Sequence, residues 1–377
     1  MPIIIAFSVV ALAVSAILYK TYVGYGDYGW YTKLSFFIFT IISIASPFIC
    51  YALRNHTPLT SVVNVSKILY FCFGFIFFLF VITLIRDILW VLVDVLRHVS
   101  LEEMKNPSHL QTANIITIIV CLCFCLYGIY EAEKDANIVS YEITSPKIKK
   151  DTKVVMLSDL HIDRDVPAKY VTNLVNRLNN LNADAIVLVG DIVDGTPINL
   201  KAQMDALKNL KAKEGVYVAL GNHEFYSGGG LIWGIAFGKM GFEFLNNYGK
   251  HLSDTGIYLA GIPDINTSVW AKMPVKLDNA LYYANPEDYV IMLSHTPKIV
   301  EGMTKDNIDL ILSGHTHGGQ IFPFHYFSKK SNDGHLAGFY NVNDIKMYVS
   351  RGTRYWGPPM RILAPSEITV FNFKPGK

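Results

Sequence analysis

Three stretches of similar design decide the fold of this chain: KVVMLSDLH (153–161), AIVLVGDIVD (185–194) and VYVALGNHE (216–224). Each begins with a short apolar run of strand length and ends in small, acidic, amide or imidazole residues. Apolar positions with helical spacing lie between them, over 168–181 and 200–210. The order strand, helix, strand, helix, strand predicts parallel strands joined by right-handed crossovers. We therefore expect an α/β domain.

Further apolar runs of strand length follow toward the C-terminus, over 257–262, 289–293, 310–313, 347–350 and 368–373. Histidines follow two of these runs directly. In open α/β sheets, functional side chains gather beyond the carboxyl ends of the strands. We therefore expect the polar residues that follow the strands to lie close together. They are Asp159, His161, Asp191, Asn222, His295, His315 and His317.

The expected cluster has the composition of a divalent metal site. Carboxylate oxygens, imidazole nitrogens and an amide carbonyl suit Mn, Fe, Zn or Ni, and the set contains no thiolate. The D-x-H pair at 159–161 and the H-x-H pair at 315–317 each offer two ligands on one short loop. Asp191 can bridge two ions. Two ions about 3.5–4 Å apart can activate a water and hold a phosphoryl group for in-line displacement.

These motifs resemble those of the calcineurin-like metallophosphoesterases, whose pattern is D-x-H, G-D-x-x-D, G-N-H-[D/E], H and G-H-x-H. Every element is present in order within residues 150–373. The longer strings GNHEFYSG (221–228), GHTHGGQIFP (314–323) and SRGTRYWGPPMRI (350–362) resemble the membrane-anchored bacterial branch of that family. The resemblance implies a metallophosphoesterase-type β-sandwich flanked by helices. It also implies a metal-dependent hydrolase of phosphoric esters or pyrophosphates.

The resemblance further implies a role for each residue of the cluster. A first divalent ion would be held by Asp159, His161 and His317. A second would be held by Asn222, His295 and His315. Asp191 would bridge the two ions, and His223 would be the acid that protonates the leaving oxygen or binds the phosphate. Asp194 and Glu224 would orient the site without binding metal, as carboxylates beside metal-binding histidines often do.

The first third of the chain differs in composition, because positions 1–130 hold only 12 of the 64 charged residues (33 basic and 31 acidic). Crossing a bilayer takes roughly 20 mostly apolar residues. Four segments approach or reach that length, at about 3–19, 34–53, 68–85 and 113–130. No positive charge precedes the first segment, so we expect an uncleaved helix rather than a signal peptide.

The sequence thus predicts three parts: a transmembrane region over 1–135, a linker over 136–150 and a metallophosphoesterase domain over 151–377. Beyond the third apolar segment, Arg86, Asp87, Asp94 and Arg97 share one face at helical spacing. Two interpretations stay open for this face. It belongs to a helix that continues past the bilayer or lies in its interface, or it lines a cavity for lipid headgroups.

Charge also bears on location and partners. Basic residues near the predicted spans number six on the side of the C-terminal domain and four on the other. The positive-inside rule then favours a multi-pass protein of the cell (inner) membrane with a cytoplasmic catalytic domain. The net charge of +2, without a dense Lys/Arg stripe, argues against nucleic-acid binding. The bilayer is the expected partner, and no obligate protein partner is evident.

The membrane region favours a lipid-linked phosphate substrate. Directly after the H-x-H loop come the aromatic residues of FPFHYF (322–327) and then Lys329 and Lys330. This combination suits a lipid phosphate or pyrophosphate that approaches from the bilayer. Packing of the segment on the domain is the alternative. Some relatives of the branch cleave UDP-2,3-diacylglucosamine in lipid A biosynthesis. The resemblance therefore makes that substrate possible here, beside phospholipids and polyprenyl phosphates.

Two other classes of function stay open. One is a catalytically silent scaffold or regulatory membrane protein on the same fold. The presence of all seven expected ligands argues against it. The other is a transporter or sensor in which the membrane spans are the active part. The low charge of those spans argues against it. Arg351, Arg354 and Arg361 follow a late strand. They would bind phosphate oxygens, or they would be solvated at the surface or make an internal ion pair.

Overall fold

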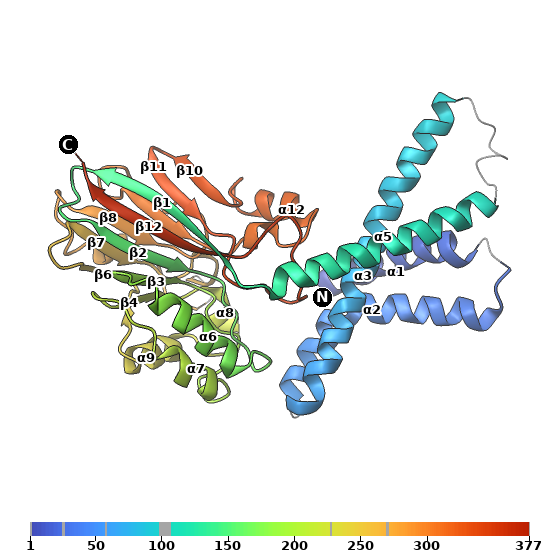
Figure 1. The fold of residues 1–377 in the computed structure, drawn as a ribbon, viewed down its shortest axis with the longest axis horizontal. Helices are drawn as coiled ribbons and strands as arrows, with labels where there is room; N and C mark the ends of the chain where they lie inside the picture. The colour runs from blue at the N-terminus through green and yellow to red at the C-terminus, as the bar shows by residue number, and fades with distance from the viewer. Residues whose placement is uncertain are drawn as a thin grey trace. The chain divides into compact units, whose positions relative to one another are not determined.

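The structure is a computed structural model, and it describes residues 2–24, 27–56, 59–97, 107–226, 228–268 and 271–376. The chain divides into two compact units (Figure 1). Unit 1 comprises Met1–Glu133 and Gly357–Met360, and unit 2 comprises Lys134–Trp356 and Arg361–Lys377.

Unit 1 is helical. Its elements are α1 (Pro2–Tyr19), η1 (Lys20–Gly24), α2 (Trp30–His56), α3 (Leu59–Leu96) and α5 (Pro107–Glu133). Three stretches are long and apolar enough to cross a membrane, and they contain the second, third and fourth predicted spans almost entirely: Trp30–Cys50, Val65–Leu96 and Ser108–Glu133. The first predicted span falls on α1, where the apolar helical stretch Ser8–Gly24 is shorter. The structure thus supports the second, third and fourth predicted spans, and the first, at about 3–19, stays a prediction.

Arg86, Asp87 and Asp94 all lie on α3, which runs without interruption to Leu96. The guanidinium of Arg86 pairs with Asp87 at 2.7 Å and donates to Asn114 Oδ1 of α5 at 2.8 Å. It also donates to Thr117 Oγ1 at 3.1 Å. An intramembrane charge needs such partners. Because those of Arg86 come from the protein, the structure favours a continuing helix over a headgroup cavity.

Unit 2 is a sandwich of two six-stranded mixed sheets, which confirms the β-sandwich that the resemblance implied. The first sheet has the order β1-β12-β2-β3-β4-β5, and the second has the order β10-β11-β9-β8-β7-β6. The strands are β1 (Asn137–Ser145), β2 (Thr152–Leu157), β3 (Ala185–Val189), β4 (Val216–Ala219), β5 (Glu243–Phe244), β6 (Tyr248–His251), β7 (Ile257–Gly261), β8 (Tyr289–Leu293), β9 (Leu310–Ser313), β10 (Gly338–Val342), β11 (Ile345–Val349) and β12 (Glu367–Pro375).

Helices α6 (Ala168–Asn179), α7 (Lys201–Leu207) and α9 (Leu231–Lys239) cover the outer face of the first sheet (Figure 1). The remaining short helices are α8 (Asn222–Tyr226), α10 (Ile265–Ser268), α11 (Leu277–Ala280), η2 (His317–Gly319) and α12 (Phe324–Ser331). Alternate residues of a strand point to opposite faces. Val155 and Leu157 accordingly pack under the helices, whereas Val154 and Met156 pack against the second sheet. Burial on both faces explains why the run KVVML has no polar alternation after its first residue.

The predicted linker over 136–150 is wrong for most of its length, because residues 137–145 form β1. This strand pairs in parallel with β12 along its whole length. It lies at the edge of its sheet, and most of its residues are exposed or half-buried. An edge strand with one covered face lacks a continuous apolar run, so hydropathy did not mark it. Tyr141 packs on Tyr348 and Phe371, with ring centroids 5.3 and 6.1 Å apart.

Candidate metal centre

The expected ligands follow strand ends as predicted. Asp159 and His161 follow β2, Asp191 follows β3, and Asn222 follows β4. These three strands are parallel neighbours in the first sheet. The remaining ligands follow the adjacent parallel strands β8 and β9 of the second sheet: His295, His315 and His317. Two packed sheets thus bring seven residues from a span of 159 positions together.

Five of these seven residues have a left-handed backbone. The φ angles are 54° for Asp159, 42° for His161, 52° for Asp191, 70° for His315 and 51° for His317. Positive φ is uncommon in residues other than glycine, and the strain concentrates at functional sites. The local backbone is therefore held in a costly conformation in which these side chains converge.

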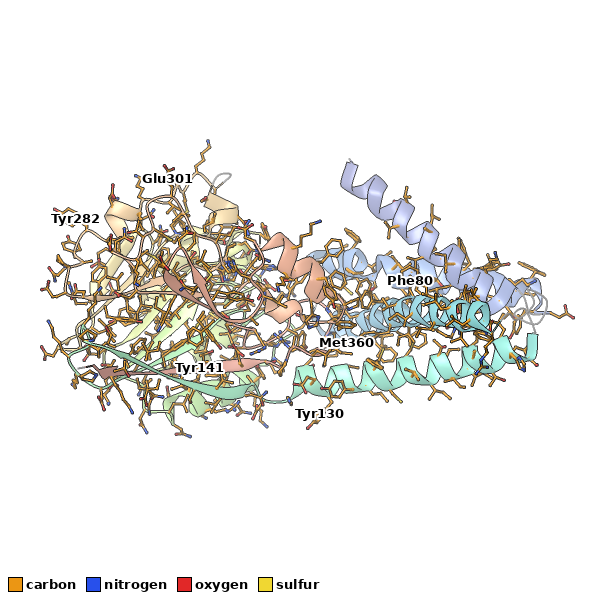
Figure 2. All side chains as sticks on the ribbon, turned by 90° about the horizontal axis from the view of Figure 1, so that it is seen from above. Phe80, Tyr130, Tyr141, Tyr282, Glu301 and Met360 are labelled. Atoms are coloured by element: carbon orange, nitrogen blue, oxygen red, sulfur yellow. The ribbon has the colours of Figure 1, made fainter. Side chains whose placement is uncertain are left out.

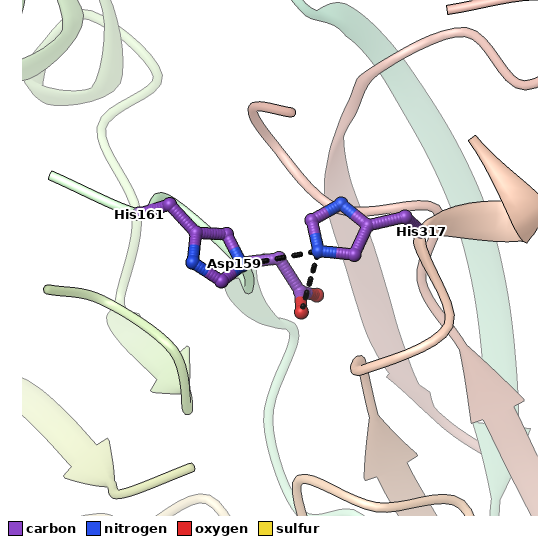
Figure 3. Close-up of side chains that lie close together, drawn as sticks. All are labelled: Asp159, His161 and His317. Atoms are coloured by element: carbon purple, nitrogen blue, oxygen red, sulfur yellow. Dashed lines mark hydrogen bonds and ion pairs between the residues drawn. The ribbon is translucent and has the colours of Figure 1, made fainter. Parts of the chain in front are cut away.

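The first group comprises Asp159, His161 and His317 (Figure 3). The Nε2 atoms of the two imidazoles lie 3.0 Å apart. His317 Nε2 lies 3.5 Å from Asp159 Oδ1. Ligands bound to one divalent cation at about 2.0–2.2 Å are separated by about 3 Å. The three ligand atoms therefore have the spacing that one cation requires.

The second group comprises Asp191, His295 and His315. His295 Nδ1 lies 2.9 Å from the carbonyl oxygen of Val189, and its Nε2 lies 3.0 Å from Asp191 Oδ2. The same Asp191 oxygen lies 3.9 Å from His161 Nε2 of the first group. One carboxylate thus faces both groups, as a bridging ligand would.

Asn222 supplies a separate test of whether a cation fits. Its Oδ1 atom is buried, and it has no hydrogen-bond donor among the described residues. A buried carbonyl oxygen without a partner is costly. A cation beside it would remove that cost, so the donor set fits a divalent metal. Neither ligand group contains a thiolate, because all five cysteines lie at position 125 or earlier and the ligands begin at Asp159.

Asp194 and Glu224 support the ligands from outside. Asp194 Oδ2 lies 3.1 Å from His161 Nδ1, and its Oδ1 lies 2.6 Å from His223 Nδ1. The carboxylate of Glu224 accepts four backbone N–H groups at 2.6–3.1 Å, from Gly221, Asp191, Ile192 and Val193. Glu224 therefore ties the loop after β4 to the loop that carries Asp191.

Burial and neighbouring charges set the protonation states. Burial lowers the pKa of His317, and His161 and Arg361 hold this pKa further below its usual range. Burial and His295 likewise lower the pKa of His315. Both rings are thereby kept in the neutral form that binds metals. Burial opposes a charge on His223, but Asp191 and Asp194 raise its pKa to about 9. The two carboxylates therefore favour the protonated form of His223.

The three arginines after β11 are engaged inside the protein. Arg351 pairs with Glu367 at 2.8 Å. Arg354 donates to the carbonyl oxygen of His161 at 3.2 Å and stacks on Tyr355. Arg361 is fully buried and donates to the carbonyl oxygen of His317 at 3.2 Å. The structure thus favours internal pairing over the alternative that these arginines bind phosphate.

The sequence interpretation missed two features near the site. Gln320 makes two hydrogen bonds to the backbone of Trp356. Its Nε2 donates to the Trp356 carbonyl oxygen at 2.8 Å, and the Trp356 N–H donates to its Oε1 at 2.9 Å. Trp356 and Tyr226 both lie edge-on to the ring of His223, at 5.5 and 5.4 Å. Neither contact follows a repeated spacing, so only the folded chain reveals it.

Asn266 is a further neighbour that the sequence interpretation missed. Its Nδ2 atom donates to Thr296 Oγ1 at 3.1 Å and lies 3.5 Å from His315 Nε2. Thr296 in turn donates to Asp264. Asp264 and Asn266 follow β7. The position of their loop after a strand of the second sheet was the signal that could have found them.

Comparisons with known proteins show which family this chain resembles. The family model described as calcineurin-like phosphoesterase matches residues 152–319, a range that contains all seven expected ligands. An uncharacterized metallophosphoesterase of Campylobacter jejuni is 34% identical over 270 residues, which are 69% of this chain and 69% of that protein. An uncharacterized metallophosphoesterase of Helicobacter pylori is 34% identical over 250 residues, 66% of each chain.

A zebrafish relative is named a transmembrane protein with a metallophosphoesterase domain. It is 31% identical over 281 residues, which are 71% of this chain and 64% of that protein. The matches therefore span about two thirds of these relatives' own lengths. Among solved structures, a dimetal phosphatase from Danio rerio matches 59% of this chain and 99% of its own. The identity is 13% and the TM-score 0.37.

Proposed function

The chain belongs to the calcineurin-like metallophosphoesterase family, and on this basis we propose that it is a membrane-bound phosphoesterase that uses two divalent cations. In this proposal it hydrolyses a phosphoester or pyrophosphate bond of a lipid-linked substrate. The family establishes the hydrolase class, and the structure establishes the apolar helices. The metal count, the residue roles and the substrate class are our proposal.

The observation that carries the proposal is the position of Asp191 between the two ligand groups. Its Oδ2 atom faces His295 Nε2 at 3.0 Å and His161 Nε2 at 3.9 Å. A carboxylate shared by two groups of oxygen and nitrogen donors is the arrangement that holds two cations close together. The residues of the first group would hold one cation and those of the second group, with Asn222, the other. Mn, Fe, Zn and Ni all suit these donors, and manganese is the first to test.

When bound, the cations would supply a water nucleophile at neutral pH and neutralise charge on the phosphoryl oxygens. The protein would supply the remaining functions. Asp194 accepts the Nδ1 proton of His223 and so directs the other ring nitrogen away from itself. The backbone N–H of His223 donates to Asp191 Oδ1 at 2.8 Å, which fixes the start of α8 against the bridging carboxylate. His223 is therefore placed to donate its proton to the leaving oxygen.

The proposed substrate class rests on the helices of unit 1 and on the surroundings of His223. Trp356 and Tyr226 are 52% and 57% exposed beside its ring. Together they offer apolar surface to a leaving group. A lipid-linked phosphate combines such a group with the charge that the metal ligands select. UDP-2,3-diacylglucosamine is a suitable test substrate, because it contains a pyrophosphate and acyl chains.

The test uses the full chain purified in detergent. Hydrolysis of bis(4-nitrophenyl) phosphate and of UDP-2,3-diacylglucosamine is measured with Mn²⁺, with a chelator, and in the Asp191→Ala variant. We expect Mn²⁺-dependent turnover of both, faster for the lipid and lost in the variant. Turnover of the chromogenic diester alone would exclude this lipid and keep the hydrolase. Absence of turnover with metal bound would favour a silent scaffold instead.

A further inference from the structure

Helix α12 (Phe324–Ser331) lies close in sequence to the metal ligands but contributes none of them. It begins five residues after Gly319, the last residue of η2, which itself starts at the ligand His317. Three large aromatic side chains on this short helix are exposed: Phe324 to 48%, Tyr326 to 70% and Phe327 to 77%. No side chain of α12 is buried. A helix with this much apolar surface toward solvent needs an explanation.

One edge of α12 is anchored to the metal-binding loop. Ser328 Oγ donates to the carbonyl oxygen of Thr316, the residue between the two ligands of the H-x-H motif, at 3.2 Å. Thr316 Oγ1 donates to the carbonyl oxygen of Leu336 at 2.6 Å. Asn332, just after the helix, donates to the carbonyl oxygen of Ser328 at 2.9 Å. The polar edge is therefore fixed, and the aromatic side chains are directed outward by a rigid support.

Two lysines complete the exposed surface. Lys329 and Lys330 lie in the last turn of α12, and both are exposed. Aromatic side chains and lysines on one short amphipathic helix are typical of segments that lie in the headgroup region of a bilayer. Each lysine near an anionic surface adds to the attraction.

We propose that α12 is an interfacial helix, which inserts Phe324, Tyr326 and Phe327 at the headgroup level of an anionic bilayer. A second copy of the chain fits less well, because a symmetric contact would bring together the lysine pairs of both copies. Anionic headgroups instead neutralise those charges. The chain also carries three helices apolar enough to cross a membrane, so a bilayer is always available to it.

The consequence concerns the metal-binding loop. Because Ser328 binds Thr316 directly, a docked α12 would hold the loop with His315 and His317 at the membrane surface. The site would then favour phosphates on amphiphilic molecules over soluble ones. This consequence for substrate choice rests on the proposed hydrolase function, whereas the docking of α12 does not.

The docking is tested with the full chain reconstituted in vesicles that contain anionic lipid. The native cysteines are first replaced, all of which lie in unit 1: Cys50, Cys72, Cys121, Cys123 and Cys125. One cysteine is then introduced as Phe327→Cys and labelled with an environment-sensitive fluorophore. The matched control is Tyr282→Cys, since Tyr282 is 76% exposed on unit 2 just after α11 (Figure 2).

We expect nitroxide-bearing lipids to quench the label at 327 and aqueous iodide to quench the label at 282. Equal quenching of both labels by iodide, with none by the lipid nitroxide, would overturn the proposal. A label at 327 that is protected from both quenchers would also overturn it, because a second copy would then cover the helix. These readings require no catalysis, so they stay interpretable if the hydrolase proposal fails.

The substrate consequence is tested with Lys329→Glu/Lys330→Glu in the same vesicles. The matched control is Lys305→Glu/Lys346→Glu, which reverses the same number of charges at two other exposed lysines. We expect kcat/KM for an anionic-vesicle-borne substrate to fall about fivefold per reversed lysine, and hydrolysis of bis(4-nitrophenyl) phosphate to stay unchanged. Equal losses in the two double variants would overturn the role of α12.

Discussion

His223 Nδ1 lies 2.6 Å from Asp194 Oδ1, and the other oxygen of the same carboxylate lies 3.1 Å from His161 Nδ1. Asp194 therefore couples the expected acid to a ligand of the first metal group. The carboxylate fixes both rings and stabilises the charged form of His223.

Replacing Asp194 with Asn should lower kcat by about 10- to 100-fold, the range seen when a partner of a metal-site histidine is lost. The carboxylate raises the pKa of His223, so its removal should lower that pKa. If the reaction needs the protonated ring, kcat should then fall, as the pH rises, at a lower pH in the variant than in the wild type. The pH profile of kcat measures this shift.

The matched control for that variant is Asp288→Asn. The Asp288 carboxylate lies 2.7 Å from His251 Nε2, and this pair contains none of the expected metal ligands. It should leave the profile unchanged. An Asp194→Asn profile that keeps the alkaline limb of the wild type would show that His223 is not the acid.

Glu224 offers a test of how the loops are held. Burial and the charge of Asp191 raise its pKa to about 7, while backbone donors such as Val193 and Gly221 oppose that rise. Glu224→Gln would point an amide N–H₂ at backbone N–H groups. We expect a loss of about 1–3 kcal/mol of unfolding free energy, the usual cost of leaving a buried hydrogen-bond donor without an acceptor. Thermal unfolding in detergent measures it, and an unchanged midpoint would contradict the role of Glu224 as the tie between loops.

Gly221 allows a test of packing around the bridging carboxylate. A Cβ at this position would overlap the side chain and the backbone nitrogen of Asp191. Gly221→Ala should therefore displace Asp191 and lower bound metal and activity together. Gly238→Ala in α9 is the control, because a Cβ there meets nothing within 4 Å. That variant should keep full activity, and equal effects of the two substitutions would refute the packing argument.

Asp184 gives a prediction of stability against pH away from the metal site. Partial burial would raise the pKa of Asp184, but the amide of Lys153 and the ammonium of Lys213 hold it below its usual value. Its stabilising effect is therefore complete above the ordinary pKa of about 3.9 and disappears as the pH falls through the lowered folded-state pKa.

We expect Asp184→Asn to reduce the unfolding free energy by about 1 kcal/mol near neutral pH. The difference from the wild type should vanish in acid. Unfolding midpoints between pH 3 and 7 measure it. The control Asp205→Asn removes an exposed pair with Lys201 and should have little effect. A difference for Asp184→Asn that grows in acid would reverse the assigned sign.

Much of this fold was predictable because its central strands are buried on both faces. Strands β2, β3 and β4 end within two residues of the predicted runs, and polar residues follow each of them. The ligand groups were predictable for the same reason, since neighbouring parallel strands end at one edge of a sheet. The edge strand β1 could not be predicted from hydropathy, because most of its residues are exposed or half-buried.

Contacts that depend on the final packing also escaped the sequence. The internal partners of Arg361 and the two hydrogen bonds between Gln320 and Trp356 join residues without a periodic relation. Aspartate adopts positive φ more often than most residues, but residue type alone did not mark Asp159 and Asp191 among the aspartates of the chain. Such features arise where tertiary contacts override local preference, which is expected at a functional site.

The central claim is that Asp191 joins two metal sites into one catalytic centre. Its most direct test is the metal content of the purified protein after loading with Mn²⁺ and removal of free metal, measured beside hydrolysis of bis(4-nitrophenyl) phosphate. We predict about two ions per wild-type chain, and in Asp191→Ala at most one ion together with the loss of activity. Two ions and undiminished hydrolysis in Asp191→Ala would contradict the bridging role on which the proposed mechanism depends.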